Sequence, residues 1–199
     1  LFQEQSGNPD LQFDDYEGQF QISLKVPLAT GLFGKRMDLY GAYTNRSFWQ
    51  MYDSENSRPF RETNHEPELW AQFRNDWRIW GFENSLNTVG FVHQSNGRSG
   101  VLSRSWNRVY ATILFERGSW AFALKPWVWL SSDKEDSDNP EIDDYMGHGE
   151  FRAVYGRNGH VFSTMLRNQL ESGFDRGAVE LSWSFPVFEY PYLKGYVQY

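Results

Sequence analysis

His93 and Ser95 stand two positions apart in the segment FVHQSNGRSGVLSRSWNR, residues 91–108, and Asn107 follows after a short glycine-containing loop. A serine hydroxyl is a weak nucleophile until a neighbouring imidazole takes its proton, and the imidazole needs a third group to fix its tautomer. These residue types are those of a Ser-His-Asn arrangement, in which an amide replaces the usual carboxylate. The chemistry that they would perform together is nucleophilic attack by the serine.

The spacing predicts that one strand presents the histidine and the serine on the same face. Side chains two positions apart in a strand point the same way, so His93 and Ser95 share the face of Val89 and Phe91. That face is otherwise apolar, and a polar pair on it is an exception to the pattern.

A hairpin centred on Gly100 would bring the third residue to the same place. If residues 85–95 and 103–116 pair as antiparallel strands, paired residue numbers sum to 200, which puts Asn107 opposite His93. Directly opposed residues have Cβ atoms about 5 Å apart, which is within reach of a side-chain hydrogen bond. A histidine and a serine two apart are nevertheless common in ordinary strands, so the pair alone does not establish a catalytic site.

The composition limits the class of protein. The 199 residues are enough for one domain, 18% of them are aromatic, and the mean hydropathy is negative. A net charge of −7 argues against nucleic acid as a partner, because the phosphate backbone requires clustered Lys and Arg. The absence of cysteine excludes a disulfide framework and a thiolate zinc site. No apolar run reaches the 18 or so residues of a transmembrane helix.

Alternation of apolar and polar residues is the main signal along the chain, and it predicts an all-β protein with ten strands and no helix. The segment QFQISLKVPL, for example, places Phe20, Ile22 and Leu24 on one face and Gln19, Gln21 and Ser23 on the other. The predicted strands cover residues 19–28, 37–49, 64–74, 85–95, 107–116, 119–130, 145–155, 160–169, 178–187 and 190–199.

Two architectures accommodate such strands: a soluble sandwich or barrel with the apolar face inward, and a transmembrane barrel with the apolar face on lipid. We favour the transmembrane barrel, because the polar face carries long side chains of both signs that suit a cross-linked lumen: Lys25, Glu66, Glu68, Gln72, Arg74, Arg108, Glu116, Lys125, Glu150, Arg152 and Glu180.

Aromatic residues and loop lengths also favour the membrane barrel. Short turns at residues 117–119 and 157–159 alternate with longer polar loops at residues 50–63 and 131–144. Rings near strand ends resemble the girdles of membrane barrels: Phe48, Trp49, Trp77, Trp80, Trp106, Trp120, Trp127, Trp129, Tyr190 and Tyr192. The remaining histidines have no comparable partners and are interpreted as lumen or rim residues: His65, His148 and His160.

Three segments resemble the outer membrane phospholipase A family: HQSNGRSGVLSRSWNR at 93–108, SRPFRETNHEPEL at 57–69 and KPW at 125–127. The resemblance implies a twelve-stranded antiparallel transmembrane β-barrel in the outer membrane of a Gram-negative bacterium, with its active site on the outer barrel surface. Residues 1–199 would then form a single barrel domain that lacks the last two strands.

The resemblance also implies roles for individual residues. Ser95 would be the nucleophile, His93 the general base and Asn107 the orienting amide, and the backbone N–H of Gly97 would donate to the oxyanion. Asn45 falls where the family places a polar residue of the dimer contact, although an ordinary rim residue is an equal interpretation.

Calcium is the implied cofactor, and the active form is implied to be a homodimer. The calcium ligands would be the carbonyl of Arg98, the carbonyl and hydroxyl of Ser103, and the hydroxyl of Ser57 from the other subunit. Oxygen ligands of this kind suit a hard cation. Asp138 aligns with an acid proposed to hold calcium in the monomer, but it lies in an acidic run that is more often a solvated loop. Gly100 departs from the family, because some relatives carry an acid there.

The implied activity is calcium-dependent hydrolysis of the acyl esters of membrane glycerophospholipids, of the A1, A2 and lysophospholipase types. One alternative is a non-catalytic barrel or pore that keeps an inactive hairpin. Another is a barrel of the lipid A deacylase type.

Overall fold

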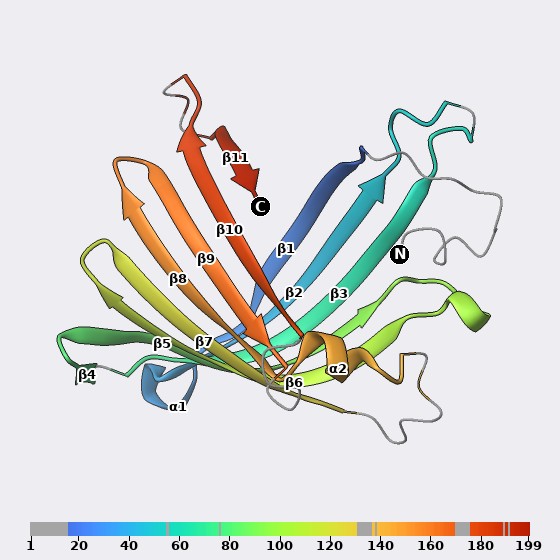
Figure 1. Ribbon diagram of the computed structural model, residues 1–199. Helices are drawn as coiled ribbons and strands as arrows, with labels where there is room; N and C mark the ends of the chain where they lie inside the picture. Colours follow the sequence, from blue (N-terminus) through green and yellow to red (C-terminus); the bar gives the residue numbers. More distant parts are fainter. Residues whose placement is uncertain are drawn as a thin grey trace.

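The computed structural model describes residues 16–54, 56–75, 77–130, 137, 139–169, 176–188, 190 and 192–199. These residues form one antiparallel sheet, which curves into a trough in Figure 1. The strands are β1 (Gly18–Gly31), β2 (Met37–Trp49), β3 (Phe60–Phe73), β4 (Arg78–Ile79), β5 (Phe82–Ser95), β6 (Ser105–Arg117), β7 (Trp120–Trp129), β8 (Gly149–Arg157), β9 (His160–Asn168), β10 (Gly177–Pro186) and β11 (Lys194–Gln198).

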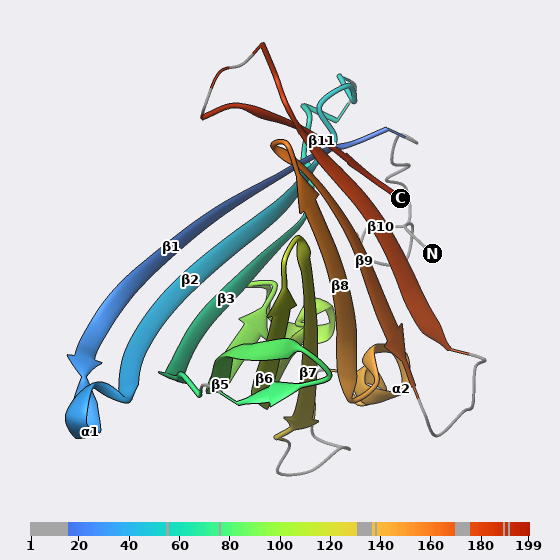
Figure 2. The same ribbon diagram turned by 90° about the vertical axis from the view of Figure 1, so that its left-hand side faces the viewer.

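The strands follow one another around the wall in chain order, and only the two-residue β4 lies off this path, paired with β5. The ten strands of the path are the ten that the alternation predicts, so the all-β fold class is confirmed. Figure 2 shows the long strands inclined along the wall. Among the described residues the sheet is not closed, and its path ends at β1 and β11.

The outer face of the wall is apolar, as the alternation requires. In β5, the side chains of Val89 and Phe91 are 52% and 41% exposed, whereas Val92, which points to the inner face, is only 4% exposed. In β1, the outward residues are all large and exposed: Phe20, Ile22, Leu24, Val26 and Leu28. In an outer-membrane barrel this face lies against lipid.

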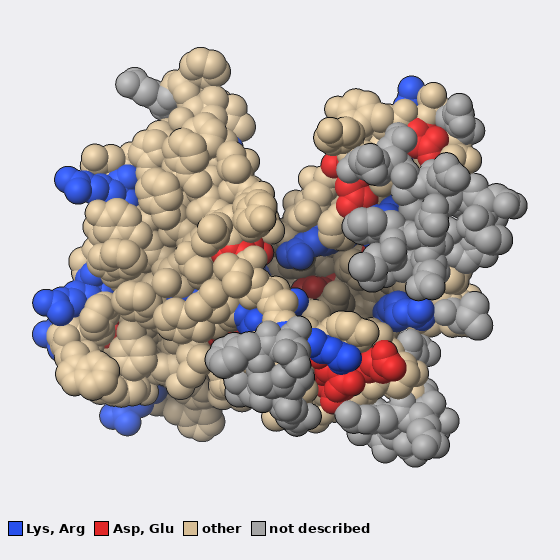
Figure 3. All heavy atoms as spheres, in the orientation of Figure 1, with Lys and Arg blue, Asp and Glu red and all other residues tan. Residues whose placement is uncertain are grey.

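The inner face combines rings and charges. Five buried side chains form a cluster at its centre: Trp70, Val92, Trp106, Tyr110 and Trp127. Cations lie over these rings, with Lys125 Nζ 4.3 Å from the centre of the Tyr110 ring and Arg108 Cζ 3.9 Å from that of Trp106. Figure 3 shows Lys, Arg, Asp and Glu side chains in the hollow between the two arms of the sheet.

Two of the predicted girdle residues belong instead to this inner cluster. Trp106 is 3% exposed and Trp127 is 5% exposed, and both face inward. Their positions near strand ends misled the prediction, because distance along a strand does not tell which face a ring occupies.

The prediction of no helix is wrong for three short elements. One helical turn joins β1 to β2 (α1, Leu32–Lys35), another precedes β8 (α2, Ile142–Met146), and a 3₁₀ turn (η2, Gly100–Leu102) precedes β6. Each element is shorter than the 11-residue or longer window in which helical periodicity can be recognised. Because α2 takes up residues 142–146, β8 begins at Gly149 rather than at residue 145. None of the helices in the described part of the chain is both long enough and apolar enough to cross a membrane.

Close packing inside the wall requires glycine at position 90. A Cβ atom at Gly90 would lie 2.6 Å from the hydroxyl of Tyr110 and 2.8 Å from Cβ of Trp70. We therefore expect Gly90→Ala to lower the free energy of unfolding by about 1–3 kcal/mol, the usual cost of overpacking a core. Urea unfolding of the refolded full-length protein in lipid vesicles measures this change.

Gly156→Ala is the matched control, because an added Cβ there meets no atom within 4 Å. The control should change the unfolding free energy by less than about 0.5 kcal/mol. Equal effects of the two substitutions would contradict the packing argument.

Candidate active site

The hairpin of β5 and β6 has the register that the sequence predicts. His93 pairs with Asn107 and Ser95 pairs with Ser105. Nδ1 of His93 and Oδ1 of Asn107 are 2.8 Å apart. Because an amide oxygen can only accept, Nδ1 of His93 carries the proton of this bond. The other ring nitrogen, Nε2, is then the acceptor that a general base needs.

Ser95 lies on the same outer face as His93, two residues further along β5. Both side chains are half-buried, and so is that of Asn107. The wall thus presents a hydroxyl, an imidazole and an amide to the lipid side. This arrangement can carry out nucleophilic attack on a group that arrives from the lipid side.

The loop after Ser95 is shaped by one buried side chain. Asn96 Oδ1 accepts hydrogen bonds from the backbone N–H of Arg98, at 3.3 Å, and of Arg104, at 3.0 Å. Its Nδ2 donates to the carbonyl of Leu102 at 2.9 Å. Gly97 has a positive φ of 67°, a conformation that glycine adopts without strain. The loop that contains Gly97 is therefore held in one shape by Asn96, the residue that follows Ser95.

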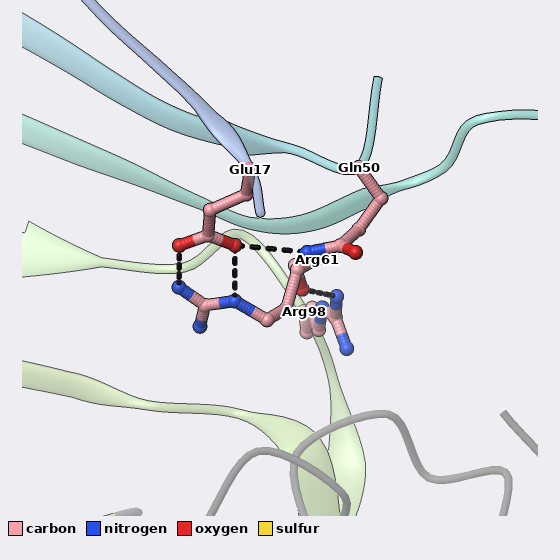
Figure 4. A network of polar contacts seen from close by, with 4 residues as sticks. All are labelled: Glu17, Gln50, Arg61 and Arg98. Atoms are coloured by element: carbon pink, nitrogen blue, oxygen red, sulfur yellow. Dashed lines mark hydrogen bonds and ion pairs between the residues drawn. The ribbon is translucent and has the colours of Figure 1, made fainter. Parts of the chain in front are cut away.

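A polar network ties this loop to three other strand ends (Figure 4). Arg98 Nη2 donates to the carbonyl of Arg61 at 2.6 Å, and the Arg61 guanidinium donates two hydrogen bonds to Glu17, at 2.8 and 2.9 Å. Gln50 Nε2 donates to the same carboxylate at 3.0 Å. Glu17 precedes β1, Gln50 follows β2 and Arg61 is the second residue of β3, so the network joins the loop to its neighbours in the wall.

His65 also lies at this site, contrary to its interpretation as a lumen or rim residue. It pairs with Ser95 across β3 and β5, and with Asn45 across β3 and β2. Its Nδ1 is 2.6 Å from the hydroxyl of Tyr43. The sequence did not reveal this neighbour, because the register between β3 and β5 depends on the connection that contains β4, whose geometry the alternation does not give.

An apolar groove of about 410 Å³ lies on the outer face beside His93. It crosses β1, β2, β3 and β5, and Gly41 on β2 leaves room where a side chain would fill it. The residues that line it are Leu24, Val26, Gly41, Ala42, Tyr43, Pro67, Glu68, Leu69, Phe91 and His93. Its volume and mostly apolar lining suit a hydrocarbon chain.

The predicted metal ligands are oxygen atoms of loops. Arg98 and Ser103 lie in the loop between β5 and β6, and Ser57 lies exposed in the loop between β2 and β3, with a φ of 59°. The Ser103 carbonyl already has a partner in the structure: it accepts a hydrogen bond from Arg104 Nη1 at 2.6 Å. Asp138 lies outside the described residues.

Carbonyl and hydroxyl oxygens fit calcium as a donor set. In the described part of the chain, no three or more His, Cys, Asp or Glu side chains cluster in a way that could hold a metal. A cation bound between Arg98 and Ser103 would share the Ser103 carbonyl with the Arg104 guanidinium or displace it.

The wall and its lipid-facing surface define a class, the outer-membrane β-barrels. Two solved structures of that class match: the Salmonella typhi outer membrane phospholipase dimer with bound calcium (TM-score 0.84) and the Escherichia coli outer membrane phospholipase A (TM-score 0.83). Both are 38% identical to this chain in sequence, and each match covers 92% of this chain. The matches cover 68% of the Salmonella typhi chain and 73% of the Escherichia coli chain. A third, at 37% identity, is an active-site mutant in which alanine replaces an asparagine.

The chain belongs to the phospholipase A1 family, whose model matches residues 2–199. Phospholipase A1 of Escherichia coli K12 is 39% identical over 171 residues, and that of Klebsiella pneumoniae is 37% identical over 182 residues. These alignments cover 86% and 92% of this chain but only 57% and 61% of the two relatives, so the chain spans somewhat more than half their length. Membership of the family places the chain in the wall of an outer-membrane barrel.

The Glu17–Arg61 pair generates a prediction for stability against pH. The Arg61 hydrogen bonds lower the pKa of Glu17 below its ordinary value of 4.5. A lowered folded-state pKa means that the ionised carboxylate stabilises the fold above pH 4.5, and that this contribution is lost as the pH falls through the folded-state value. We expect Glu17→Gln to lower the unfolding free energy by about 1–2 kcal/mol at pH 7, and by progressively less below pH 4.5.

Urea unfolding of the full-length protein across a pH series measures this difference. Glu83→Gln is the matched control, because the Arg78–Glu83 ion pair is exposed, with 70% and 49% of the two side chains accessible. Exposed pairs contribute little. A Glu17→Gln effect that does not change between pH 7 and pH 3 would contradict the ion-pair argument.

Proposed function

We propose that this chain carries the active site of a calcium-dependent phospholipase that hydrolyses acyl ester bonds of membrane glycerophospholipids, at either acyl position and in lysophospholipids. The observation that carries the proposal is the 2.8 Å contact between His93 Nδ1 and Asn107 Oδ1, on the strand face that also carries Ser95. Membership of the phospholipase A1 family supports the same reaction class.

The proposed reaction begins with proton transfer from the Ser95 hydroxyl to Nε2 of His93. Oγ of Ser95 forms a bond to the ester carbonyl carbon, and the carbonyl π electrons move to oxygen to give a tetrahedral oxyanion. The oxyanion collapses, the bond to the glycerol oxygen breaks, and His93 returns its proton to that oxygen. Asn107 keeps Nδ1 protonated throughout, so that Nε2 is always the atom that exchanges the proton.

The acyl-enzyme is then hydrolysed by the same groups. His93 takes a proton from water, the hydroxide adds to the acyl carbon, and Oγ of Ser95 leaves with the proton returned from His93. The products are a lysophospholipid and a fatty acid. The backbone N–H of Gly97 is the proposed donor to both oxyanions, in the loop that Asn96 holds.

Calcium, when bound, would supply positive charge beside the oxyanion. The proposed ligands are the carbonyls of Arg98 and Ser103, the hydroxyl of Ser103, and Ser57 from a second copy of the chain. The Salmonella typhi relative is a dimer with bound calcium, which supports a calcium-binding homodimer. The position of the cation between the two subunits is part of the proposal. An incomplete ligand set would leave the monomer inactive, so that dimerisation switches the enzyme on.

The proposed substrate reaches the outer face of the wall laterally, from within the membrane. The apolar groove beside His93 would hold an acyl chain of the phospholipid, with its ester next to Ser95. An outward-facing site is otherwise costly, because polar groups in lipid must find partners. The hydrogen bond between His93 and Asn107 offsets that cost for Nδ1, and Nε2 stays available to accept a proton.

Replacing the nucleophile tests the reaction. Ser95→Ala should lower fatty acid release from phosphatidylcholine vesicles by at least about 10³-fold, since triad residues account for that much or more of the rate. The measurement uses the refolded full-length protein with calcium and with a chelator. Ser119→Ala, an exposed serine in the turn at the opposite rim, is the matched control and should retain full activity.

The outcomes separate the alternatives. No release by the unchanged protein in calcium would point to a non-catalytic barrel or pore. Release of acyl chains from lipid A but not from phospholipid would point to a deacylase. Release that persists in Ser95→Ala would remove Ser95 as the nucleophile.

Ser57 tests the shared calcium site. Loss of one hydroxyl ligand should raise the calcium concentration needed for half-maximal activity about tenfold, equivalent to about 1.4 kcal/mol, without changing the unfolding free energy. Calcium titrations of Ser57→Ala are compared with Ser54→Ala, an exposed serine of the same loop. An unchanged calcium dependence in Ser57→Ala would exclude Ser57 as a ligand.

A further inference from the structure

We propose that His65 is a second catalytic histidine, which donates a hydrogen bond from Nε2–H to the oxyanion that forms at Ser95. This inference rests on the proposed ester hydrolysis and adds a residue to it. It assigns opposite roles to the two imidazoles beside the serine: His93 accepts a proton, and His65 donates a hydrogen bond.

The sheet register places His65 beside the nucleophile. His65 on β3 pairs with Ser95 on β5, so the two side chains lie on the same outer face. Directly paired residues have Cβ atoms about 4.5–5.5 Å apart, and an imidazole spans that gap. On the other side of β5, the register places His93 opposite Asn107 of β6. The two histidines near Ser95 therefore come from different strands, His93 from β5 and His65 from β3.

The hydrogen bonds at Nδ1 fix the tautomer of His65. Nδ1 lies 2.6 Å from the Tyr43 hydroxyl and 3.3 Å from Asn45 Nδ2. An amide NH₂ group can only donate, and its orientation is supported by Ser47 Oγ, which donates to the Oδ1 of Asn45 at 3.2 Å. With the Asn45 amide oriented in this way, Nδ1 is the acceptor, and in a neutral imidazole the proton then lies on Nε2.

The Nε2 edge of the ring faces the proposed oxyanion loop. A Cβ atom built on Gly97 would lie 3.4 Å from both Nε2 and Cδ2 of His65. The imidazole thus packs against the residue whose backbone N–H is the proposed oxyanion donor. Two N–H groups, one from the backbone and one from a side chain, would meet at the place where the carbonyl oxygen of the substrate becomes negative.

In this tautomer His65 cannot act as a second base. Nε2 carries the proton, and the Tyr43 hydroxyl and the Asn45 amide share the single lone pair of Nδ1, so the ring has no lone pair to offer to Ser95. A neutral donor does not require proton transfer during the reaction: it strengthens its hydrogen bond as charge develops on the oxygen. Tyr43 and Asn45 are then positioning residues, since they act on the substrate only through His65.

Ester and thionoester substrates distinguish an oxyanion donor from a structural residue. Sulfur accepts hydrogen bonds more weakly than oxygen, so an enzyme with a full set of donors prefers the oxygen ester strongly. His65→Phe should lower kcat for a short-chain ester about 100-fold, as loss of one oxyanion donor does, with KM changed less than about twofold. The ratio of kcat for ester over thionoester should fall by about tenfold or more.

Two further variants keep the test independent of folding. His65→Gln retains an N–H donor and should recover part of both the rate and the ester preference. Tyr43→Phe removes the hydroxyl that fixes Nδ1 without touching Ser95, and should lower kcat by less than His65→Phe does. His160→Phe is the control, because His160 contacts Trp183 far along the sheet, on β9 and β10.

All assays use the refolded full-length protein with calcium. An unchanged ester preference in His65→Phe, with wild-type activity present, would overturn the role of His65 alone. An equal loss of rate on ester and thionoester would also overturn it, because a structural defect affects both substrates. Absence of hydrolysis by the wild-type protein would overturn the proposed function, and the His65 role with it.

Discussion

Hydrogen-bonded pairing between neighbouring strands is the constraint from which the other features of this wall follow. In lipid the backbone groups of each strand must find partners in the adjacent strands, and the pairing then dictates which side chains meet. The row that runs from Asn45 through His65 and Ser95 to Ser105 exists because β2, β3, β5 and β6 are locked in register. A slip of one residue would turn every one of these side chains to the other face.

The two faces of the wall perform different tasks on the same backbone. Residues that alternate with His93 and Ser95 face inward, where Val92 belongs to the ring cluster and Gln94 accepts a hydrogen bond from Trp106. The network of Glu17, Arg61 and Arg98 secures the loop that follows. These contacts lie away from the outer face, which can therefore remain open to lipid.

Much of this could be predicted from residue patterns, and the limits are physical. Ten strands and the pairing of His93 with Asn107 follow from alternation and from a hairpin short enough for simple counting. The place of His65 does not, because β3 and β5 are joined through β4 and only the folded register brings them together. The sequence did not reveal that Trp106 and Trp127 face inward, because a position near a strand end does not tell which face of the sheet a ring occupies. It also did not reveal the short helices α1 and α2, because a single helical turn is too short to show helical periodicity. The catalytic and metal-binding roles remain predictions.

The groove beside His93 lies on the face of the wall that an outer-membrane barrel turns to lipid. A phospholipid, the proposed substrate, would reach it by lateral diffusion within one leaflet, in two dimensions. The rate of encounter would then depend on the mole fraction of substrate in the surrounding leaflet and on how its acyl chains are packed, not on a concentration in bulk solution. Membrane composition and order would thus govern the supply of substrate to the site, even for a protein whose own structure does not change.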